Sequence, residues 1–577
     1  MHRIVAVSVA VLALLLGTSS AAVGVTPTPV AAPLAVGTGG AATSVDPIAT
    51  GVAIDTLDHG GNAVDAAVAA AAALGVVEPF SCGIGGGGFM VIYSAADHTV
   101  TTIDGRETAP AAFRPNSFLE NGVPITFAEG VTSGLGVGVP GTFRTWQVAA
   151  DRFGTMPLQR LLAPAKAIAN DGFVVDQTFH DQVVSNAARF ADFTSTSALY
   201  LPNGQAPATG SIFRNPELAT TYARIGGRGA DAFYSGKVAD AIVDAVQHPP
   251  ITPGATRKIR PGLMETSDLA AYRAPIRPPT HITYRGLDVY GMGPPSSGGS
   301  TIGEALNILE GYDLPALDTV TRHHLMFEAA ALAYADRNQY LGDPDQVSIP
   351  LAGLLSDSYA AERRALIGWP ADQTTNVPYA FGDPTDNTGP STTHLTVSDR
   401  WGNVVSYTFT IEQIGGSGIV VPGYGFLLNN ELTDFNFVTG TANSPAGGKR
   451  PRSSMAPTIV LDHGAPLVAL GSPGGSMIPT TVLQILVDHL DGGLGLLDAV
   501  AEPRASQRNT ATVAAEPAFI ALPEATALTA LHGHRFSASA EIGAATGIKF
   551  LAGGVVQAVA EPVRRGGGSA MVVAPAP

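Results

Sequence analysis

Two short runs of alternating residue types carry the side chains best suited to nucleophilic chemistry. Residues 392–399 (TTHLTVSD) and 403–411 (NVVSYTFTI) alternate with period two and are joined by Arg400-Trp401-Gly402, which is typical of a β-hairpin. With the turn centred on Trp401, residues equally far from it face each other, so Thr392 faces Thr410 with Cβ atoms about 5 Å apart. Such a pair offers a nucleophile and its hydrogen-bonding partner, or simply two threonines in a sheet, where threonine is common.

Other catalytic chemistries lack their usual side chains. The 13 histidines show no HExxH or other regular metal-ligand spacing, and the adjacent His323 and His324 fall in a helical stretch where neighbours point to different faces. No serine has the G-x-S-x-G surroundings of a hydrolase nucleophile. The single cysteine, Cys82, can build neither an intrachain disulfide nor a cysteine-rich metal site, and it lacks the context of a cysteine-protease nucleophile. We therefore expect neither a metal nor a cofactor.

A glycine run at residues 83–88 has the spacing of a nucleotide-binding motif. Gly83-x-Gly85-x-x-Gly88 matches the dinucleotide fingerprint, which must follow a strand and open a helix so that the helix N-terminus meets the pyrophosphate. Here the alanine-rich, helix-forming residues 62–77 come first and the β-like residues 89–93 follow. The reversed order predicts close packing of a helix against a strand instead of nucleotide binding.

The pattern of helical and strand-like stretches predicts a layered α/β protein. Further helices are expected at 157–171, 216–225, 237–247 and 320–340, and alternating β-branched segments dominate from about residue 391. The chain has 577 residues, 45% of them hydrophobic, and can bury a large core. Its net charge of −16 disfavours a role in binding nucleic acid or anionic lipid.

The first residues have the composition of an export signal. Met1-His2-Arg3 is a short basic start, residues 4–16 are almost entirely apolar, and small residues follow. We expect residues 1–22 to be a cleaved signal peptide and residues 23–44 a Pro/Ala/Gly-rich linker. The protein is then expected to be secreted, to the extracellular or cell-envelope space, with no permanent membrane anchor.

Ten segments spread along the chain resemble the gamma-glutamyltransferase (gamma-glutamyltranspeptidase) family of N-terminal nucleophile hydrolases. Because they run collinearly from about residue 45 to the C-terminal region, they are far more specific together than any single motif. The segments are GGNAVDAAVAAAAALGVVEP (60–79), GIGGGGFM (83–90), DGRETAP (104–110), GVPGT (138–142), FGTMPLQRLLAPA (153–165), PPSSGG (294–299), ADR with YLGDP (335–344), STTH (391–394), KRPRSSMAPTIV (449–460) and GSPGGS (471–476).

The resemblance implies a four-layer αββα sandwich formed jointly by two subunits of one precursor. Family members cut themselves before the threonine that matches Thr392, here at the Ser391–Thr392 bond. This divides the chain into a large subunit, residues 45–391, and a small subunit, residues 392–577. A new N-terminal amine titrates near about 7.7–8.0 and can take the proton of its own residue's hydroxyl, which fits a chain without a Ser-His-Asp set.

The implied activity is cleavage of γ-glutamyl amides such as glutathione or glutamine. The γ-glutamyl group would form an ester with Thr392 and pass to water, to an amino acid or to a short peptide. Thr410 matches the threonine that hydrogen-bonds the nucleophile. Gly474 and Gly475 match the glycine pair whose N–H groups form the oxyanion hole, where bare backbone allows the acyl carbonyl to approach closely.

The resemblance also implies a donor-binding set. Arg106 matches the arginine that binds the donor's α-carboxylate, a task suited to a guanidinium fork. Ser453 and Ser454 match the serine pair that supplements it. Glu431 and Asp434 match the positions that hold the donor's α-ammonium. Another residue, Glu412, lies where many members have Asn and some have Glu, so it should line the site.

One departure from the family pattern concerns the cover of the pocket. Only 14 residues separate Asp434 from Lys449, and none of them is Tyr or Trp, whereas many members carry a longer lid with an aromatic side chain here. The sequence is similar to the lidless members. Two alternatives stay open: a cephalosporin (glutaryl) acylase of the same fold, and a processed but inactive binding protein. The Arg106 and Asp434 pair disfavours the first, because a glutaryl group has no α-ammonium.

Overall fold

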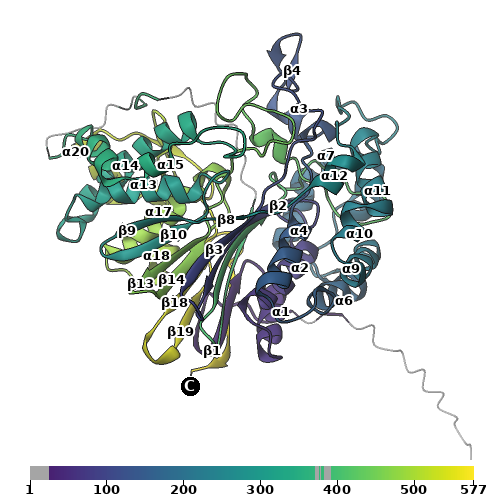
Figure 1. Ribbon diagram of the computed structural model, residues 1–577, viewed down its shortest axis with the longest axis horizontal. Coiled ribbons are helices and arrows are strands. Elements are labelled where there is room, and N and C mark those ends of the chain that lie inside the picture. Colours follow the sequence, from purple (N-terminus) through teal and green to yellow (C-terminus); the bar gives the residue numbers. More distant parts are fainter. Residues whose placement is uncertain (1–24, 27, 371–375, 377, 382–391, 577) are drawn as a thin grey trace, which may run out of the picture.

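A long antiparallel sheet runs through the middle of the molecule (Figure 1). The computed structural model describes residues 25–26, 28–370, 376, 378–381 and 392–576, so the expected signal peptide and Ser391 lie outside the described residues. The strands follow the order β8-β3-β2-β12-β11-β1-β19-β18-β14-β13-β10-β9, and β20 pairs with β1. Their bounds are β1 Leu34–Ser44, β2 Gly87–Ser94, β3 Thr99–Gly105, β8 Ile276–Arg277, β9 Thr280–Tyr284, β10 Leu287–Gly291, β11 Thr393–Asp399, β12 Val404–Thr410, β13 Thr458–Asp462, β14 Ala465–Gly471, β18 Thr546–Phe550, β19 Val556–Val559 and β20 Ser569–Pro575.

The sheet folds back on itself, so that β11 and β12 lie face to face with β14 and β18. The Ser406 hydroxyl on β12 donates to the carbonyl of Leu470 on β14 at 3.1 Å, and the ring of His394 on β11 packs against Gly471. Helices cover both outer faces (Figure 1). The result is the expected four-layer αββα sandwich.

One helical layer packs on the β2, β11 and β12 side and holds the first hydrophobic core. Its helices are α1 Pro47–Asp58, α2 Ala63–Val77, α4 Thr142–Phe153, α5 Leu158–Leu161, α6 Ala163–Asp171, α7 Gln177–Phe190, α8 Thr194–Tyr200, α9 Pro216–Arg228, α10 Asp231–Tyr234, α11 Gly236–Gln247 and α12 Thr266–Ala271. Helix α2 is buried along its whole length because its alanines let it lie close to the sheet. The helices expected at 62–77, 157–171, 216–225 and 237–247 are therefore confirmed, the second as two consecutive helices.

The other helical layer packs on the β10, β13 and β14 side around the second core. Its helices are α13 Gly298–Glu310, α14 Thr319–Tyr340, α15 Leu351–Leu354, α16 Asp357–Ala365, α17 Ile478–Leu490, α18 Leu496–Ala501, α19 Pro517–Ile520 and α20 Pro523–His532. The helix expected at 320–340 is α14. The last third of the chain is less purely strand-like than expected, since it also supplies the buried helix α17.

Short elements complete the fold. They are α3 Phe127–Val131, β4 Leu119–Glu120, β5 Val123–Pro124, β6 Phe173–Val174, β7 Ile212–Phe213, β15 Ala505–Ser506, β16 Val513–Ala515, β17 Phe536–Ala538, and the 3-10 turns η1 Gly134–Gly136, η2 Pro202–Gly204, η3 Leu314–Ala316, η4 Glu431–Asp434, η5 Gly475–Met477 and η6 Ala552–Gly554. None of the helices in the described ranges combines the length and the apolar character needed to cross a membrane.

The expected linker at 23–44 is wrong over its second half, because residues 34–44 form strand β1. The first part of β1, Leu34 to Gly37, pairs with β19, and the later part, Gly40 to Thr43, pairs with β11. Gly39, between these parts, and Gly40, the first residue of the later part, have φ +83° and +118°, which glycine adopts without strain. The glycines that suggested a linker therefore let one strand pair with both layers.

Candidate active site

The hairpin of β11 and β12 has the register that the sequence predicts. Thr393 pairs with Phe409 and Ser398 with Val404, so the turn is centred on Trp401. The turn is fixed by Asp399, whose Oδ1 accepts from the N–H groups of Trp401 at 2.9 Å and Asn403 at 3.0 Å. Because the register is right, Thr392 and Thr410 meet at the open end of the hairpin.

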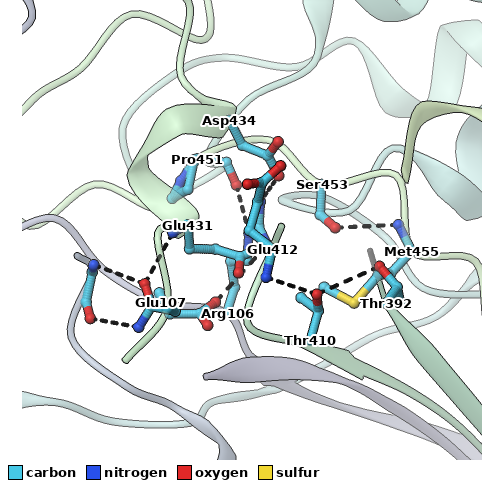
Figure 2. Close-up of polar contacts among 12 residues, drawn as sticks. Arg106, Glu107, Thr392, Thr410, Glu412, Glu431, Asp434, Pro451, Ser453 and Met455 are labelled. Carbon is cyan, nitrogen blue, oxygen red and sulfur yellow. Dashed lines mark hydrogen bonds and ion pairs between the residues drawn. The ribbon is translucent and has the colours of Figure 1, made fainter. Parts of the chain in front are cut away.

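The two threonine hydroxyls form the centre of the site (Figure 2). Thr392 is 3% exposed, and its Oγ1 donates to Oγ1 of Thr410 at 3.5 Å. The Thr410 oxygen also accepts from the N–H of Glu412 at 2.8 Å, a contact that forms with Glu412 at φ +77°. On its other side, the carbonyl of Thr392 accepts from Arg565 Nη1 at 2.9 Å. Thr392 is therefore held at both its side chain and its backbone.

The glycine run of residues 83–88 lies directly behind these threonines. It joins α2 to β2, the order that the sequence predicts for close packing, and β2 pairs with β12. A Cβ on Gly86 would stand 1.9 Å from the carbonyl oxygen of Thr410, so glycine is required there. Cys82 beside the run is 1% exposed, and burial raises the pKa of its thiol well above the usual value, which disfavours a thiolate nucleophile.

A buried arginine lies at the other end of the site. Arg106, just after β3, is fully buried, and its Nη1 and Nη2 donate to Glu431 and Asp434 of the turn η4. Its Nε also donates to the carbonyl of Pro451 at 3.0 Å (Figure 2). The fold therefore brings Arg106 together with carboxylates more than 300 positions away in the chain.

More carboxyl groups surround this arginine than one positive charge can neutralise. Glu107 lies 3.9 Å from Arg106 Nη1 and is fully buried. Burial and the nearby acids raise the pKa of Glu107 and of Glu412 well above the usual range. Burial also raises the pKa of Glu431, to about 7, although the Arg106 charge opposes this. We therefore expect part of the cluster to be protonated at neutral pH.

A small, partly open cavity connects the two ends of the site. Its lining is Thr392, Thr410, Glu412, Glu431, Asp434, Ser453, Ser454, Met455, Gly475, Ser476 and Ile478. Eight of these match residues selected from the sequence. The other two selected residues are not part of this lining: Arg106 contacts Glu431 and Asp434, and Gly474 directly precedes Gly475. Asp434 and Glu431 stand between Arg106 and the cavity.

The glycine pair occupies a turn that leads into helix α17. Gly474 has φ +134° and Gly475 φ +56°, both in the region that favours glycine. Two consecutive residues of this kind turn the backbone at the start of a helix, whose N-terminal end carries partial positive charge. The turn and helix dipole are suited to an oxygen that gains negative charge.

The sequence did not single out several residues that support the cavity. Met455, Ser476 and Ile478 line it. From outside the wall, Arg337 Nη2 of α14 donates to the Ser454 hydroxyl at 2.6 Å, and Arg508 Nη1 donates to that of Ser476. Ser476 and Arg337 fall within segments that carried the family resemblance, but Arg508 and Arg565 fall in none of them.

The two adjacent histidines of α14 do face different partners. His323 Nε2 lies 3.0 Å from Asp488, and His324 Nδ1 lies 2.9 Å from Nε2 of His534. His324, His534 and Glu328 are the described residues whose spacing could hold a metal ion. The direct hydrogen bond between the two imidazoles explains their proximity without an ion.

Comparison with known proteins agrees with this arrangement. An αββα sandwich with a threonine at the start of a central strand defines the class of N-terminal nucleophile hydrolases. The gamma-glutamyltranspeptidase family model matches residues 49–571, so the chain belongs to that family.

Two curated relatives and one solved structure illustrate the similarity. The glutathione hydrolase proenzyme of Bacillus subtilis (strain 168) is 41% identical over 488 residues, covering 81% of each chain. That of Escherichia coli (strain K12) is 38% identical over 487 residues, covering 81% of this chain and 80% of the relative. The crystal structure of cephalosporin acylase from Bacillus halodurans superposes with a TM-score of 0.82 at 29% identity, covering 94% of this chain and 98% of that one.

Proposed function

We propose that the protein cuts itself at Ser391–Thr392 and then works as a γ-glutamyltransferase and glutathione hydrolase. The observation that carries the proposal is the Thr392–Thr410 hydroxyl pair facing one cavity with the Glu431–Asp434 turn. The names of the relatives, glutathione hydrolase proenzymes, support both the processing and the activity.

In the proposed reaction, the freed α-amine of Thr392 takes the proton of its own hydroxyl. The Thr392 oxygen attacks the γ-carbonyl carbon of the donor, and the resulting oxyanion is held at the N–H groups of Gly474 and Gly475. The carbon–nitrogen bond then breaks, the leaving amine takes the proton from the Thr392 ammonium, and a γ-glutamyl ester remains. Water or an amine acceptor attacks the ester and releases Thr392.

Donor binding is proposed to exchange partners within the buried charge cluster. The α-carboxylate of the donor would take a place beside Arg106, supplemented by the hydroxyls of Ser453 and Ser454. The α-ammonium would meet the carboxylates of Asp434 and Glu431. The donor is a zwitterion, so its carboxylate pairs with Arg106 and its ammonium pairs with the carboxylates that Arg106 gives up. The exchange therefore leaves no buried charge unpaired.

Donor charge disfavours one alternative, and the intact catalytic set disfavours the other. A glutaryl donor carries the carboxylate but no ammonium, so it would leave Asp434 without a cation. This disfavours a cephalosporin acylase despite the similarity to one. An inactive binding protein is disfavoured because Thr392, Thr410, Gly474 and Gly475 are all present and the threonine pair is aligned.

The short segment between Asp434 and Lys449 supports the acceptance of large donors. Without a long lid, bulky or polymeric γ-glutamyl compounds should enter, and water should compete well with amine acceptors. Comparable kcat/KM for γ-glutamyl dipeptides and longer γ-linked oligomers would agree with this. Rejection of every donor larger than glutathione would contradict it.

Two further features belong to the proposal. The protein is proposed to be exported by its N-terminal 22 residues, and to remain a heterodimer after cleavage. The second point is supported by the sheet, in which β11 and β12 of the small subunit lie between β1 and β2 of the large subunit. Mass spectrometry of secreted protein would identify both mature N-termini.

The direct test of the activity uses two chromogenic donors that differ in one group. Purified protein is incubated with γ-glutamyl-p-nitroanilide and with glutaryl-p-nitroanilide, with and without a dipeptide acceptor. We expect the γ-glutamyl compound to be cleaved preferentially and a transfer product to form with the acceptor. Preference for the glutaryl compound would support the acylase instead, and cleavage of neither would support the binding protein.

A further inference from the structure

The guanidinium of Arg508 lies near the turn of Gly474 and Gly475 (the oxyanion turn), and it has no assigned role in binding the donor. Arg508 donates from Nη1 to the hydroxyl of Ser476, and Ser476 lines the cavity directly after Gly475. Arg508 is half-buried, so its charge is only partly screened by solvent. The ionisable side chains in the described lining, by contrast, are Glu412, Glu431 and Asp434, all acidic.

The loop that carries Arg508 is fixed on both sides of it. Before it, the Gln507 side chain accepts from the N–H of Thr510 at 2.9 Å and donates to its carbonyl at 3.1 Å. After it, Asn509 accepts from the N–H of Tyr379 at 2.7 Å and donates to the Tyr379 carbonyl at 3.1 Å. Asn509 is 1% exposed and has φ +62°. These contacts order the backbone, so the arginine is presented at a defined place.

The position of Ser476, next to the glycine pair proposed to hold the oxyanion, indicates which part of a donor lies near Arg508. In the proposed reaction, the γ-carbonyl oxygen points to Gly474 and Gly475, while the α-groups of the donor point to the Arg106 end. The lining continues from Gly475 to Ser476, which Arg508 contacts from behind, and this side is left for the atoms beyond the scissile nitrogen. A carboxylate is the group that a guanidinium at such a wall recognises best.

We propose that Arg508 forms a subsite for leaving amines, and for acceptor amines, that carry a carboxylate on the carbon next to the nitrogen. These are free amino acids and the next residue of a γ-linked glutamate chain. In glutathione that position is an amide carbonyl, so Arg508 would favour γ-glutamyl amino acids over glutathione. The inference rests on the proposed γ-glutamyl transfer and adds to it a preference among substrates.

The test compares two donors that differ only in this carboxylate, γ-glutamylglycine and γ-glutamylglycinamide. The measured quantity is kcat/KM for γ-glutamylglycine divided by kcat/KM for γ-glutamylglycinamide. It is determined in wild type, Arg508→Gln and Arg508→Lys, with γ-glutamyl-p-nitroanilide as an activity standard. The control is Arg535→Gln, which removes an exposed arginine of the same subunit. Self-cleavage into two chains shows that each variant has folded.

We expect Arg508→Gln to lower the ratio about 10-fold, Arg508→Lys to restore part of it and Arg535→Gln to leave it at the wild-type value. High salt should lower the wild-type ratio as well. An unchanged ratio in Arg508→Gln would overturn the inference, as would equal losses on both donors, which would mean that Arg508 only supports the Ser476 turn. If the wild type cleaves the p-nitroanilide but shows no preference for the glycine donor, the proposed function stands and the subsite falls.

Discussion

The two ends of the cavity are built on different physical principles (Figure 2). The nucleophile end consists of neutral hydroxyls on one hairpin, where Thr392 and Thr410 are only 18 positions apart. The donor end consists of ionisable groups contributed by distant loops, where Arg106 meets Glu431 and Asp434. The first end is fixed by strand register, and the second by the balance between burial and opposite charge.

This difference determines how each end should respond to mutation. At the hairpin, a substitution removes a reacting atom and leaves the fold of the sheet unchanged, so the effect should be all or none. At the charge cluster, a substitution shifts the balance among several coupled groups, so effects should be graded and should depend on pH and on the charge of the donor. Four predictions test this contrast, from the largest expected effect to the smallest.

The largest effect is expected for Thr392→Ala. Without the hydroxyl, neither self-cleavage nor ester formation can occur, so the variant should remain one uncut and inactive chain. Gel electrophoresis with N-terminal sequencing of the wild-type small subunit, which should begin at Thr392, checks the prediction. A wild-type protein that stays uncut and is fully active would remove the proposed mechanism.

A graded effect is expected for Asp434→Asn. The substitution keeps the shape but removes a charge from the cluster, and charge-assisted hydrogen bonds of this kind contribute about 1.5–3 kcal/mol. We expect kcat/KM for γ-glutamyl-p-nitroanilide to fall about 10- to 200-fold.

For glutaryl-p-nitroanilide we expect kcat/KM to rise in Asp434→Asn. With this substrate the wild type must bury the Asp434 carboxylate without a cation opposite it, and the variant need not. Both p-nitroanilides are measured on both proteins. Equal losses on the two substrates would mean that Asp434 is only structural, and the contrast between the two ends would lose its main support.

A pH dependence is expected from Glu431. Burial raises the pKa of this carboxyl to about 7, so the group is protonated below that pH and charged above it. Only the charged form attracts an α-ammonium, so the Ki of the product glutamate should fall up to about 10-fold from pH 6 to pH 8. Glutamate binding involves no chemistry, which keeps titration of the Thr392 amine out of the measurement.

In Glu431→Gln the Ki of glutamate should be higher than that of the wild type at pH 8, and it should be nearly independent of pH. A wild-type Ki that does not change over this range would show that Glu431 is already charged at pH 6. The raised pKa of Glu431 would then not control glutamate binding between pH 6 and pH 8.

The smallest effect is expected for Glu107→Gln. Burial and the neighbouring acids raise the pKa of Glu107 well above the usual range, so we expect the group to carry little charge in the wild type. Glutamine has the same shape and is also neutral, so kcat/KM should stay within about threefold of wild type. A loss as large as that of Asp434→Asn would show that Glu107 is charged and shares in holding Arg106.

Much of the nucleophile end could be predicted from the sequence because its geometry is local. Period-two alternation and a short glycine-containing loop fix the hairpin register, and register alone decides that Thr392 faces Thr410. Resemblance to a family supplied the donor set, and eight of the ten selected residues do line the cavity. Composition misled the interpretation at β1, since glycines that permit a strand to change layers also resemble a linker.

What the sequence by itself determined is the class of chemistry: a hydroxyl pair on a hairpin, no alternative nucleophile in a suitable context, and helices and strands that stack in layers. What only the tertiary structure decided is the electrostatic state of the site and its supporting arginines. The pKa values of Glu107 and Glu431 depend on burial and on a guanidinium hundreds of residues from Glu431, which no local pattern encodes. Arg508 lies behind Ser476 of the cavity lining only because the loop of residues 507–510 folds against that serine. Register is a property of neighbouring residues, whereas desolvation is a property of the whole fold.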